Sequence, residues 1–235
     1  MNVRRLVGSL LTTTLAAAAL SVVATASPAA AATTTKIVAS SGSSWLTYSS
    51  YRSQPGAPAV GDTIYFSVNV VATDGTDDPY EGTVTVQRQL RGSSAWATIA
   101  TSSYAGYYGS TKAVSNASYR VLYSGGTGYG GDAWSASSSA KSVSVQRKLS
   151  ITPKSGRKLG LAVKVAPKGK VKMAVLKKHG KKWKKFKSVK TSRAGKAFVK
   201  LPAPARGKKF YWKIQIKPSS RFALTQSTTY YTTKY

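Results

Sequence analysis

The chain has no cysteine, a single histidine, and no acidic residue after Asp132. Without cysteine it cannot form disulfide bonds, a zinc–thiolate centre or a lipidated cysteine anchor. Its six acidic residues stand against 36 lysines and arginines, which gives a formal net charge of +30 at pH 7. A protein with this imbalance repels itself unless anions surround it, so the composition points to an anionic partner.

The basic excess is concentrated in the last third of the chain. Residues 148–235 contain 22 lysines, 4 arginines and no Asp or Glu, whereas residues 33–147 carry eight bases against six acids. Domains commonly span about 100 to 150 residues, so this break in charge predicts two of them. We expect a near-neutral domain at 33–147 and a strongly basic one at 148–235.

The residues that catalysis needs are scarce. No carboxylate in 148–235 could orient His179 as a Ser-His-Asp arrangement requires. No Gly-rich phosphate loop leads from a strand into a helix. A paired-carboxylate hydrolase would have to use Asp62, Asp132 or the acidic segment at 74–81. We therefore expect no catalytic residues, no cofactor and no enzyme activity, and keep a wall-associated enzyme or its accessory as the third alternative.

The acidic segment contains Asp74, Asp77, Asp78 and Glu81 together with glycine and proline. Oxygen ligands at this density are able to hold calcium, but their spacing matches no EF-hand loop. Glycine and proline at these places are typical of a turn between two strands. We expect a turn here and no metal site.

The N-terminus has the parts of a secretory signal peptide, which we place at residues 1–32. Arg4 and Arg5 form the positive start, residues 6–23 the apolar run, and three alanines ending at Ala32 the cleavage site, with Ala26 as the alternative. A transmembrane anchor is the competing interpretation, but serine and threonine interrupt the run and no stop-transfer charges follow. The prediction is a secreted protein, extracellular or cell-wall associated.

The rest of the sequence alternates apolar and polar residues in short runs, as at 64–70, 84–87, 161–165 and 212–216. Period-two alternation places one set of side chains inward, as in half-buried antiparallel strands. Glycine and proline clusters separate the runs at regular spacing. The sequence therefore predicts an all-β fold of antiparallel β-sandwiches.

The two predicted domains repeat one order of residues: an apolar strand, a tryptophan, then a strand led by tyrosine or tryptophan. Segment 84–99 matches 171–186 at an offset of 87 residues, so that Val84–Val86 corresponds to Val171–Met173 and Trp96 to Trp183. Segment 119–123 matches 212–216 at an offset of 93. One domain type present twice explains both matches; chance similarity is the alternative.

This order resembles bacterial Ig-like domains. In the first half the resemblance is carried by Val84–Arg88, Trp96, Ala105-Gly106, Tyr119–Val121 and Tyr123–Gly125; in the second, 177–183, Ala194-Gly195 and 212–216 match more loosely. The resemblance implies tandem Ig-like sandwiches of the kind found in secreted and cell-surface proteins, particularly of actinobacteria. Such modules serve spacing, adhesion and polymer binding and share no catalytic site. The long segment 41–60 and the charge of the second half depart from the family's pattern.

The densest basic run is 177–187. Its apolar residues Trp183, Phe186 and Val189 are spaced by three, which would suit a cationic amphipathic helix. The matching segment at 96–101 has β-branched residues instead, so we predict a strand, with a bulge between the tryptophan and the phenylalanine.

Lysines on every predicted strand and turn of the basic half indicate a binding surface. Lysine acts as a mobile point charge, whereas specific grasp of bases or phosphates favours arginine. This predicts diffuse attraction to an anionic polymer, with counterion release supplying affinity, and no sequence-specific nucleic-acid binding. The candidate polyanion-binding residues are Lys168, Lys170, Lys172, Lys177, Lys178, Lys181, Lys182, Lys184, Lys185, Lys187, Lys208 and Lys209.

The aromatic residues divide into two expected groups. Trp96, Trp183, Tyr119 and Trp212 recur at matching places and are expected in the core. Tyr107, Tyr108 and Trp134 lie beside glycines and are candidate glycan contacts.

The function that we expect is therefore a secreted, non-catalytic binding protein. Its basic domain would attach to an anionic cell-wall polymer, acidic glycan, DNA or anionic lipid surface. The alternative is an adhesion or carbohydrate-binding module that uses the aromatics of the first domain. The oligomeric state is left open.

Overall fold

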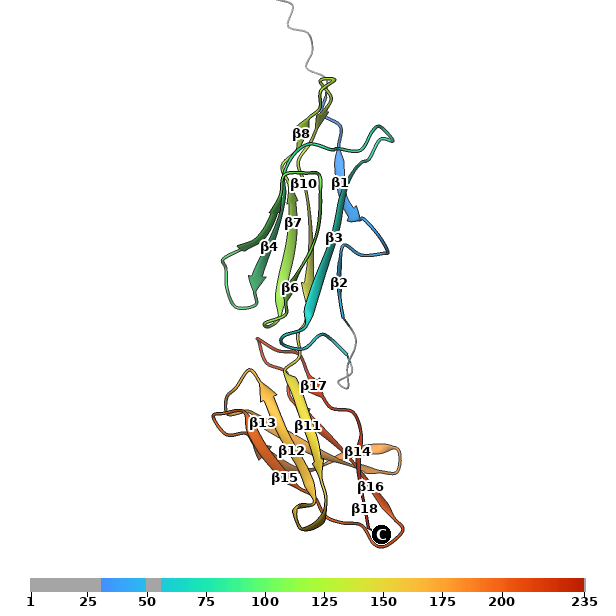
Figure 1. The fold of residues 1–235 in the computed structure, drawn as a ribbon, viewed down its shortest axis with the longest axis vertical. Helices are drawn as coiled ribbons and strands as arrows, with labels where there is room; N and C mark the ends of the chain where they lie inside the picture. Colours follow the sequence, from blue (N-terminus) through green and yellow to red (C-terminus); the bar gives the residue numbers. More distant parts are fainter. Residues whose placement is uncertain (1–30, 50–55, 235) are drawn as a thin grey trace, which may run out of the picture. The chain divides into compact units, whose positions relative to one another are not determined.

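The computed structural model describes residues 31–49 and 56–234, which form β-strands and one short 3₁₀ turn but no α-helix (Figure 1). This all-β content is what the alternating sequence predicts. The first 30 residues of the predicted signal peptide lie outside the described residues, so that assignment stays a prediction.

The strands upstream of the charge break are β1 (Thr35–Ala39), β2 (Leu46–Tyr48), β3 (Thr63–Ala72), β4 (Val84–Leu90), β5 (Ala97–Ser102), β6 (Gly106–Lys112), β7 (Ala117–Tyr123), β8 (Gly126–Thr127), β9 (Ala133–Trp134) and β10 (Ser137–Val143). The later elements are β11 (Lys148–Lys154), the 3₁₀ turn η1 (Gly156–Lys158), β12 (Gly160–Ala166), β13 (Lys172–His179), β14 (Lys182–Lys190), β15 (Lys196–Lys200), β16 (Lys209–Ile216), β17 (Thr225–Gln226) and β18 (Tyr230–Thr233).

These strands pair antiparallel in four main sheets. In the first, β3 pairs with β1, β2 and β6, and the second has the order β10-β7-β4-β5. The third has the order β11-β12-β15, and in the fourth β14-β13-β16 continues to β17 and β18, which both pair with β16. Strands β8 and β9 form a small additional ribbon.

Each pair of sheets encloses its own hydrophobic cluster, the arrangement of a β-sandwich. One cluster combines apolar residues of β3 with those of β4 and β7, and includes Phe66, Val86 and Tyr119. The other combines β12 and β15 with β13 and β16, and includes Val163 and Trp212. Burial of alternate side chains therefore drives sheet pairing in both halves.

The two halves use the same strand pairing. The set β1-β3-β6 corresponds to β11-β12-β15, and β10-β7-β4-β5 to β18-β16-β13-β14. Within this repeat the sequence alignment of one strand was wrong by two residues. Val86 pairs with Val121, whereas the residue opposite the equivalent Ile214 is Val175, not Met173. The hairpin β13–β14 turns through only two residues, so β13 runs further before it reverses.

The predicted bulge is present in both halves. Register shifts on the β4–β5 ladder so that Ile99 is the extra residue, and on the β13–β14 ladder so that Phe186 is. A bulge reverses the side-chain alternation of the strand that contains it. It therefore determines which way the preceding tryptophan points.

The Ala-Gly pairs of the repeat allow close approach of two strands. A Cβ on Gly195 would lie 2.5 Å from the carbonyl oxygen of Val165, and φ of Gly195 is +72°. A Cβ on Gly106 would lie 3.2 Å from the carbonyl oxygen of Val68. The second site is tight and the first is closed to any side chain.

The segment between β10 and β11 is held by hydrogen bonds. Val145 and Gln146 are buried, and Asn116 accepts a bond from the Val145 amide at 2.7 Å while its side-chain amide donates to the Ser220 carbonyl at 3.1 Å. The Asn116 backbone amide donates to the Arg221 carbonyl at 2.8 Å. All described residues belong to one compact unit, so the boundary at 147/148 stays a prediction.

Candidate polyanion-binding surface

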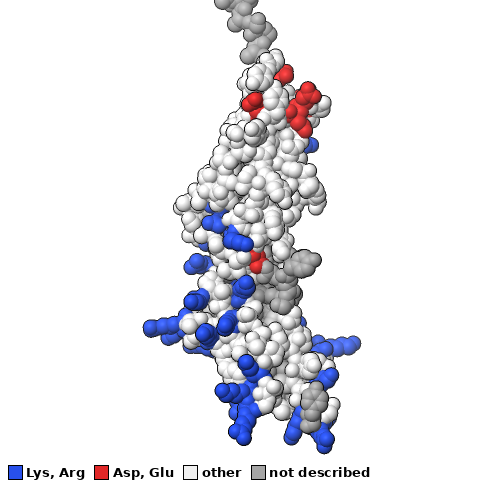
Figure 2. All heavy atoms as spheres, viewed as in Figure 1, with Lys and Arg blue, Asp and Glu red and all other residues white. Residues whose placement is uncertain are grey.

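The second half presents lysines on both of its outer sheet faces because its inward positions are occupied by apolar residues. In β12 Val163 and Val165 are buried while Lys164 is exposed, and in β13 Met173 and Val175 are buried while Lys172 is exposed. The face seen in Figure 2 shows lysine and arginine gathered over the β11–β18 part and the acidic residues over the β1–β10 part. No carboxylate side chain exists in 148–234 to neutralise these charges.

Most of the predicted lysines are exposed in the structure: Lys168, Lys170, Lys172, Lys178, Lys181, Lys182, Lys184, Lys185, Lys208 and Lys209. Two are half-buried and turned inward. The Lys177 ammonium lies 3.4 Å from the centre of the Phe210 ring, and the Lys187 ammonium donates to the Lys200 carbonyl. These two lysines cover the edge of the core, so their contribution to an outer binding surface is smaller than the sequence suggested.

The expectation that Trp183 belongs to the core was wrong. Trp183 is half-buried and lies outside the hydrophobic cluster, whereas Trp212 is fully buried within it. The bulge at Phe186 reverses the alternation of β14 and turns Trp183 to the outer face. There the Lys213 ammonium lies 4.8 Å from the centre of a Trp183 ring.

Trp96 in the first half was misplaced for the same reason. It is half-buried and outside the cluster, while Tyr119 is buried as expected. The Arg120 guanidinium lies 4.3 Å from the Trp96 ring centre, in the place that Lys213 takes above Trp183. The repeat therefore conserves between its two copies an outward cation–aromatic pair rather than a core tryptophan.

Aromatic rings and lysines alternate across the outer face of β14, β13, β16 and β18. Trp183 pairs with Lys178, whose ammonium lies 5.7 Å from the Tyr211 ring centre. Tyr211 in turn pairs with Tyr231, and Lys209 lies 5.1 Å from the centre of that ring. We call this set the lysine–aromatic row: Trp183, Lys178, Tyr211, Tyr231, Lys209 and Lys213.

Sequence reasoning missed Tyr211, Tyr231 and Lys213 as surface residues. The signal was present, because residues 209–217 alternate strictly, and Phe210, Trp212, Ile214 and Ile216 point inward. Alternation then requires the residues between them to share the outer face.

The three candidate glycan contacts do not form one exposed surface. Tyr107 and Tyr108 are consecutive in β6 and therefore point to opposite sides of the sheet. Tyr107 packs against the core beside Phe66, Tyr108 is 79% exposed, and Trp134 is only 5% exposed, with its ring edge against Tyr80. Of the three, Tyr108 alone presents an open ring.

The carboxylates of the acidic segment are used in its turn. Asp74 accepts hydrogen bonds from the Thr76 hydroxyl at 2.7 Å and amide at 3.1 Å, which lower the pKa of Asp74. Asp78 accepts from the Ala72 amide at 3.0 Å. Within the described residues no three His, Cys, Asp or Glu side chains lie close enough to share a metal ion. His179 is exposed at the β13–β14 turn.

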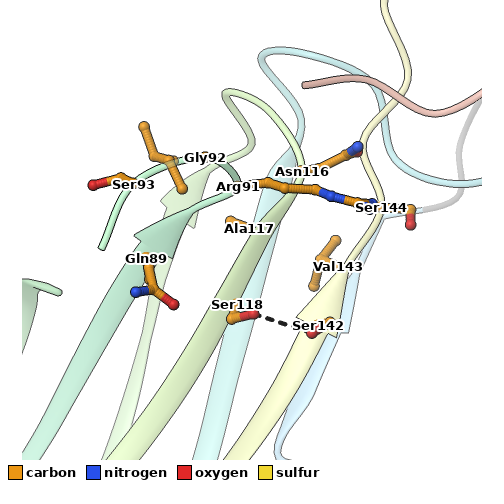
Figure 3. Close-up of a pocket in the computed structure, with 11 residues that line it drawn as sticks. Gln89, Arg91, Gly92, Ser93, Asn116, Ala117, Ser118, Ser142, Val143 and Ser144 are labelled. Carbon is orange, nitrogen blue, oxygen red and sulfur yellow. Dashed lines mark hydrogen bonds between the residues drawn. The ribbon is translucent and has the colours of Figure 1, made fainter. Parts of the chain in front are cut away.

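A polar hollow of about 300 Å³ lies at the end of β4, β7 and β10 (Figure 3). Its lining includes Arg91, Asn116 and several serines, two of which, Ser118 and Ser142, are 3.1 Å apart. The Arg91 side chain extends through it toward Ser144 (Figure 3). Its lining contains no carboxylate or histidine, so this hollow offers no general base.

Positive charge is also concentrated near the segment that precedes β11. The Arg147 guanidinium stacks 4.2 Å from the Phe222 ring centre. Burial lowers the pKa of Arg147, and the nearby Arg221 lowers it further. The field of the basic half therefore begins at this segment.

No helix in the described part of the chain is both long and apolar enough to cross a membrane. The chain matches no protein-family model and no curated protein. The lysine-rich outer faces and the lysine–aromatic row are therefore the basis for a functional conclusion.

Proposed function

We propose that this is an exported, non-catalytic binding protein whose basic half attaches it to an anionic extracellular polymer. The observation that carries the proposal is the combination of 22 lysines and 4 arginines on residues 148–235 with no carboxylate side chain among them. Ten of the twelve lysines first picked as contacts are exposed. A surface charged in this way gains free energy when a polyanion releases its condensed counterions.

The finer fold assignment belongs to the same proposal. We infer two tandem Ig-like sandwiches, at 33–147 and 148–235, that follow a signal peptide at 1–32. The shared strand pairing and the two hydrophobic clusters support this assignment. The near-neutral half would then act as a spacer or carry a second contact.

The test is retention of the chain from Thr33 onward on purified cell walls, on nucleic acid and on neutral glycan, across a salt series. Binding to the polyanions should fall about a thousandfold or more between 50 and 200 mM salt if six or more anionic groups are contacted. Binding to neutral glycan should be weak at every salt concentration. Retention on neutral glycan that ignores salt would instead support the carbohydrate-binding alternative, with Tyr108 as its first candidate contact.

A further inference from the structure

The outer face of β14, β13 and β16 contains a hollow of about 270 Å³ beside the lysine–aromatic row. Ala174 pairs with Ser188 on one side and with Gln215 on the other, so a methyl group lies between a hydroxyl and an amide. Three lysines complete the lining, one from each strand or its end: Lys172, Lys185 and Lys217.

This position in the sheet makes the hollow a defined place rather than a chance gap between mobile chains. Met173 and Val175 are buried on one side of Ala174, and Ile214 and Ile216 are buried around Gln215. The floor is therefore fixed by the core beneath it. A diffuse basic surface needs no such floor, because counterion release depends on charge number and not on shape.

The lining favours one kind of anion. Planar carboxylates are matched best by the fork of an arginine, and the hollow contains no arginine. A phosphate group spreads its charge over several oxygens in three dimensions, which suits point charges converging from three strands. The neutral hydroxyl and amide add hydrogen bonds without cancelling that charge.

We propose that this hollow, which we call the phosphate seat, binds a phosphate group of the anionic polymer. Lys172, Lys185 and Lys217 supply the charge, and Ser188 and Gln215 orient the group. The inference rests on the proposed function and deepens it, since it replaces purely diffuse attraction with a fixed contact. The lysine–aromatic row then holds neighbouring parts of the same polymer.

The decisive variant changes the shape of the seat without changing its charge. In Ala174→Leu the larger side chain fills the floor while every lysine remains. Ala174 is half-buried on the outer face of a strand, and the core does not have to rearrange. Affinity for long-chain inorganic polyphosphate, measured by titration calorimetry, should fall about tenfold or more, the loss expected when charge-assisted hydrogen bonds are removed. Affinity for polyglutamate of similar length should stay within about twofold.

A second variant removes charge, with a matched control. Lys172→Gln with Lys217→Gln takes two charges from the seat, and Lys181→Gln with Lys208→Gln takes two from exposed turns outside it. The seat variant should lose at least tenfold more polyphosphate affinity than the control, which should lose about one unit of salt slope per phosphate contact and little more. Thermal unfolding of each variant verifies that it is folded.

The outcomes separate the two proposals. Equal affinity losses in seat and control variants, together with an Ala174→Leu protein that binds as wild type does, would overturn the phosphate seat and leave the polyanion function in place. A wild-type protein that binds neither polyphosphate nor polyglutamate at 50 mM salt would overturn both. Oligothymidylate and phosphatidylglycerol vesicles run in parallel identify the phosphate source, as the ligand whose binding Ala174→Leu weakens most.

Discussion

Two tryptophans of the basic half have opposite roles although both were expected in the core. Trp212 is fully buried, and its indole N–H donates to the Thr232 hydroxyl at 3.0 Å. Phe186 meets its ring edge at 5.2 Å. Trp183 lies on the outer face under Lys213. The identity of the residue is the same, and the bulge decides its environment.

We therefore predict different results for alanine at these two sites. Trp212→Ala should destabilise the protein by roughly 3 to 5 kcal/mol, the range for a buried aromatic ring. Trp183→Ala should cost only about 1 kcal/mol, the order of a cation–aromatic contact, and should weaken polyanion binding by freeing Lys213. Urea unfolding and binding titrations measure the two effects. A Trp183→Ala protein that unfolds as readily as Trp212→Ala would place Trp183 back in the core.

Tyr119 presents a polar atom to the other core. Its hydroxyl is buried and has no hydrogen-bond partner among the described residues. Burial raises the pKa of Tyr119 above its ordinary value of 10.0, and the charge of Arg88 opposes that shift. The stability that depends on the neutral phenol is therefore present below about pH 10 and is lost as the pH rises through the folded-state pKa.

Tyr119→Phe should remove this alkaline loss. At pH 7 the variant should match wild type within about 1 kcal/mol, because no hydrogen bond is broken. Between about pH 10 and 11.5 its free energy of unfolding should decrease less than that of wild type. Lysines titrate in both proteins, so the difference between the two curves isolates the phenol. Parallel curves would show that Tyr119 remains neutral for another reason or is less buried.

At the scale of elements, the Ala-Gly pairs determine how closely β6 and β15 approach the strands beside them. Gly195→Ala should destabilise the protein by roughly 2 to 4 kcal/mol, because the backbone is left-handed there and the new Cβ meets a carbonyl. Gly106→Ala should cost less than about 1.5 kcal/mol, since only the 3.2 Å contact must relax. Chemical denaturation of the two variants tests the ranking, and a reversed order would contradict the assigned geometry.

The sequence was sufficient for the strands and for the buried residues that alternate in them. It was also sufficient for the bulges, because Trp96 and Ile99 are separated by an odd number of positions and so are Trp183 and Phe186. It misjudged the direction of both tryptophans, since parity upstream of a bulge depends on which residue is extra. It missed Gln215, Ser188 and Lys217 as neighbours, because pairing across three strands follows from register, which residue patterns constrain only weakly.

For the whole molecule, the absence of acids after Asp132 leaves the lysines of β11–β18 without attractive partners of opposite charge on side chains. Their mutual repulsion opposes folding and is screened by salt over about 8 to 10 Å at 0.10 to 0.15 M.

We predict that raising sodium chloride from about 20 to 200 mM raises the Tm by several degrees, because about 1 kcal/mol corresponds to roughly 2 to 8 °C for domains of these sizes. Differential scanning calorimetry measures this, and polyphosphate at 20 mM salt should raise the Tm further as a ligand of the folded state. A Tm that is flat or falls with salt would show that repulsion does not limit stability.

Strand β14 lies at the edge of its sheet, and five of its nine residues are lysine. An open edge of this kind is a template for pairing with another chain, and lysines prevent that pairing. Once a polymer neutralises those lysines, the same edge loses its protection. Neighbouring copies on one polymer strand are then free to associate through β14, so that the polymer becomes coated in contiguous stretches and the free protein remains monodisperse.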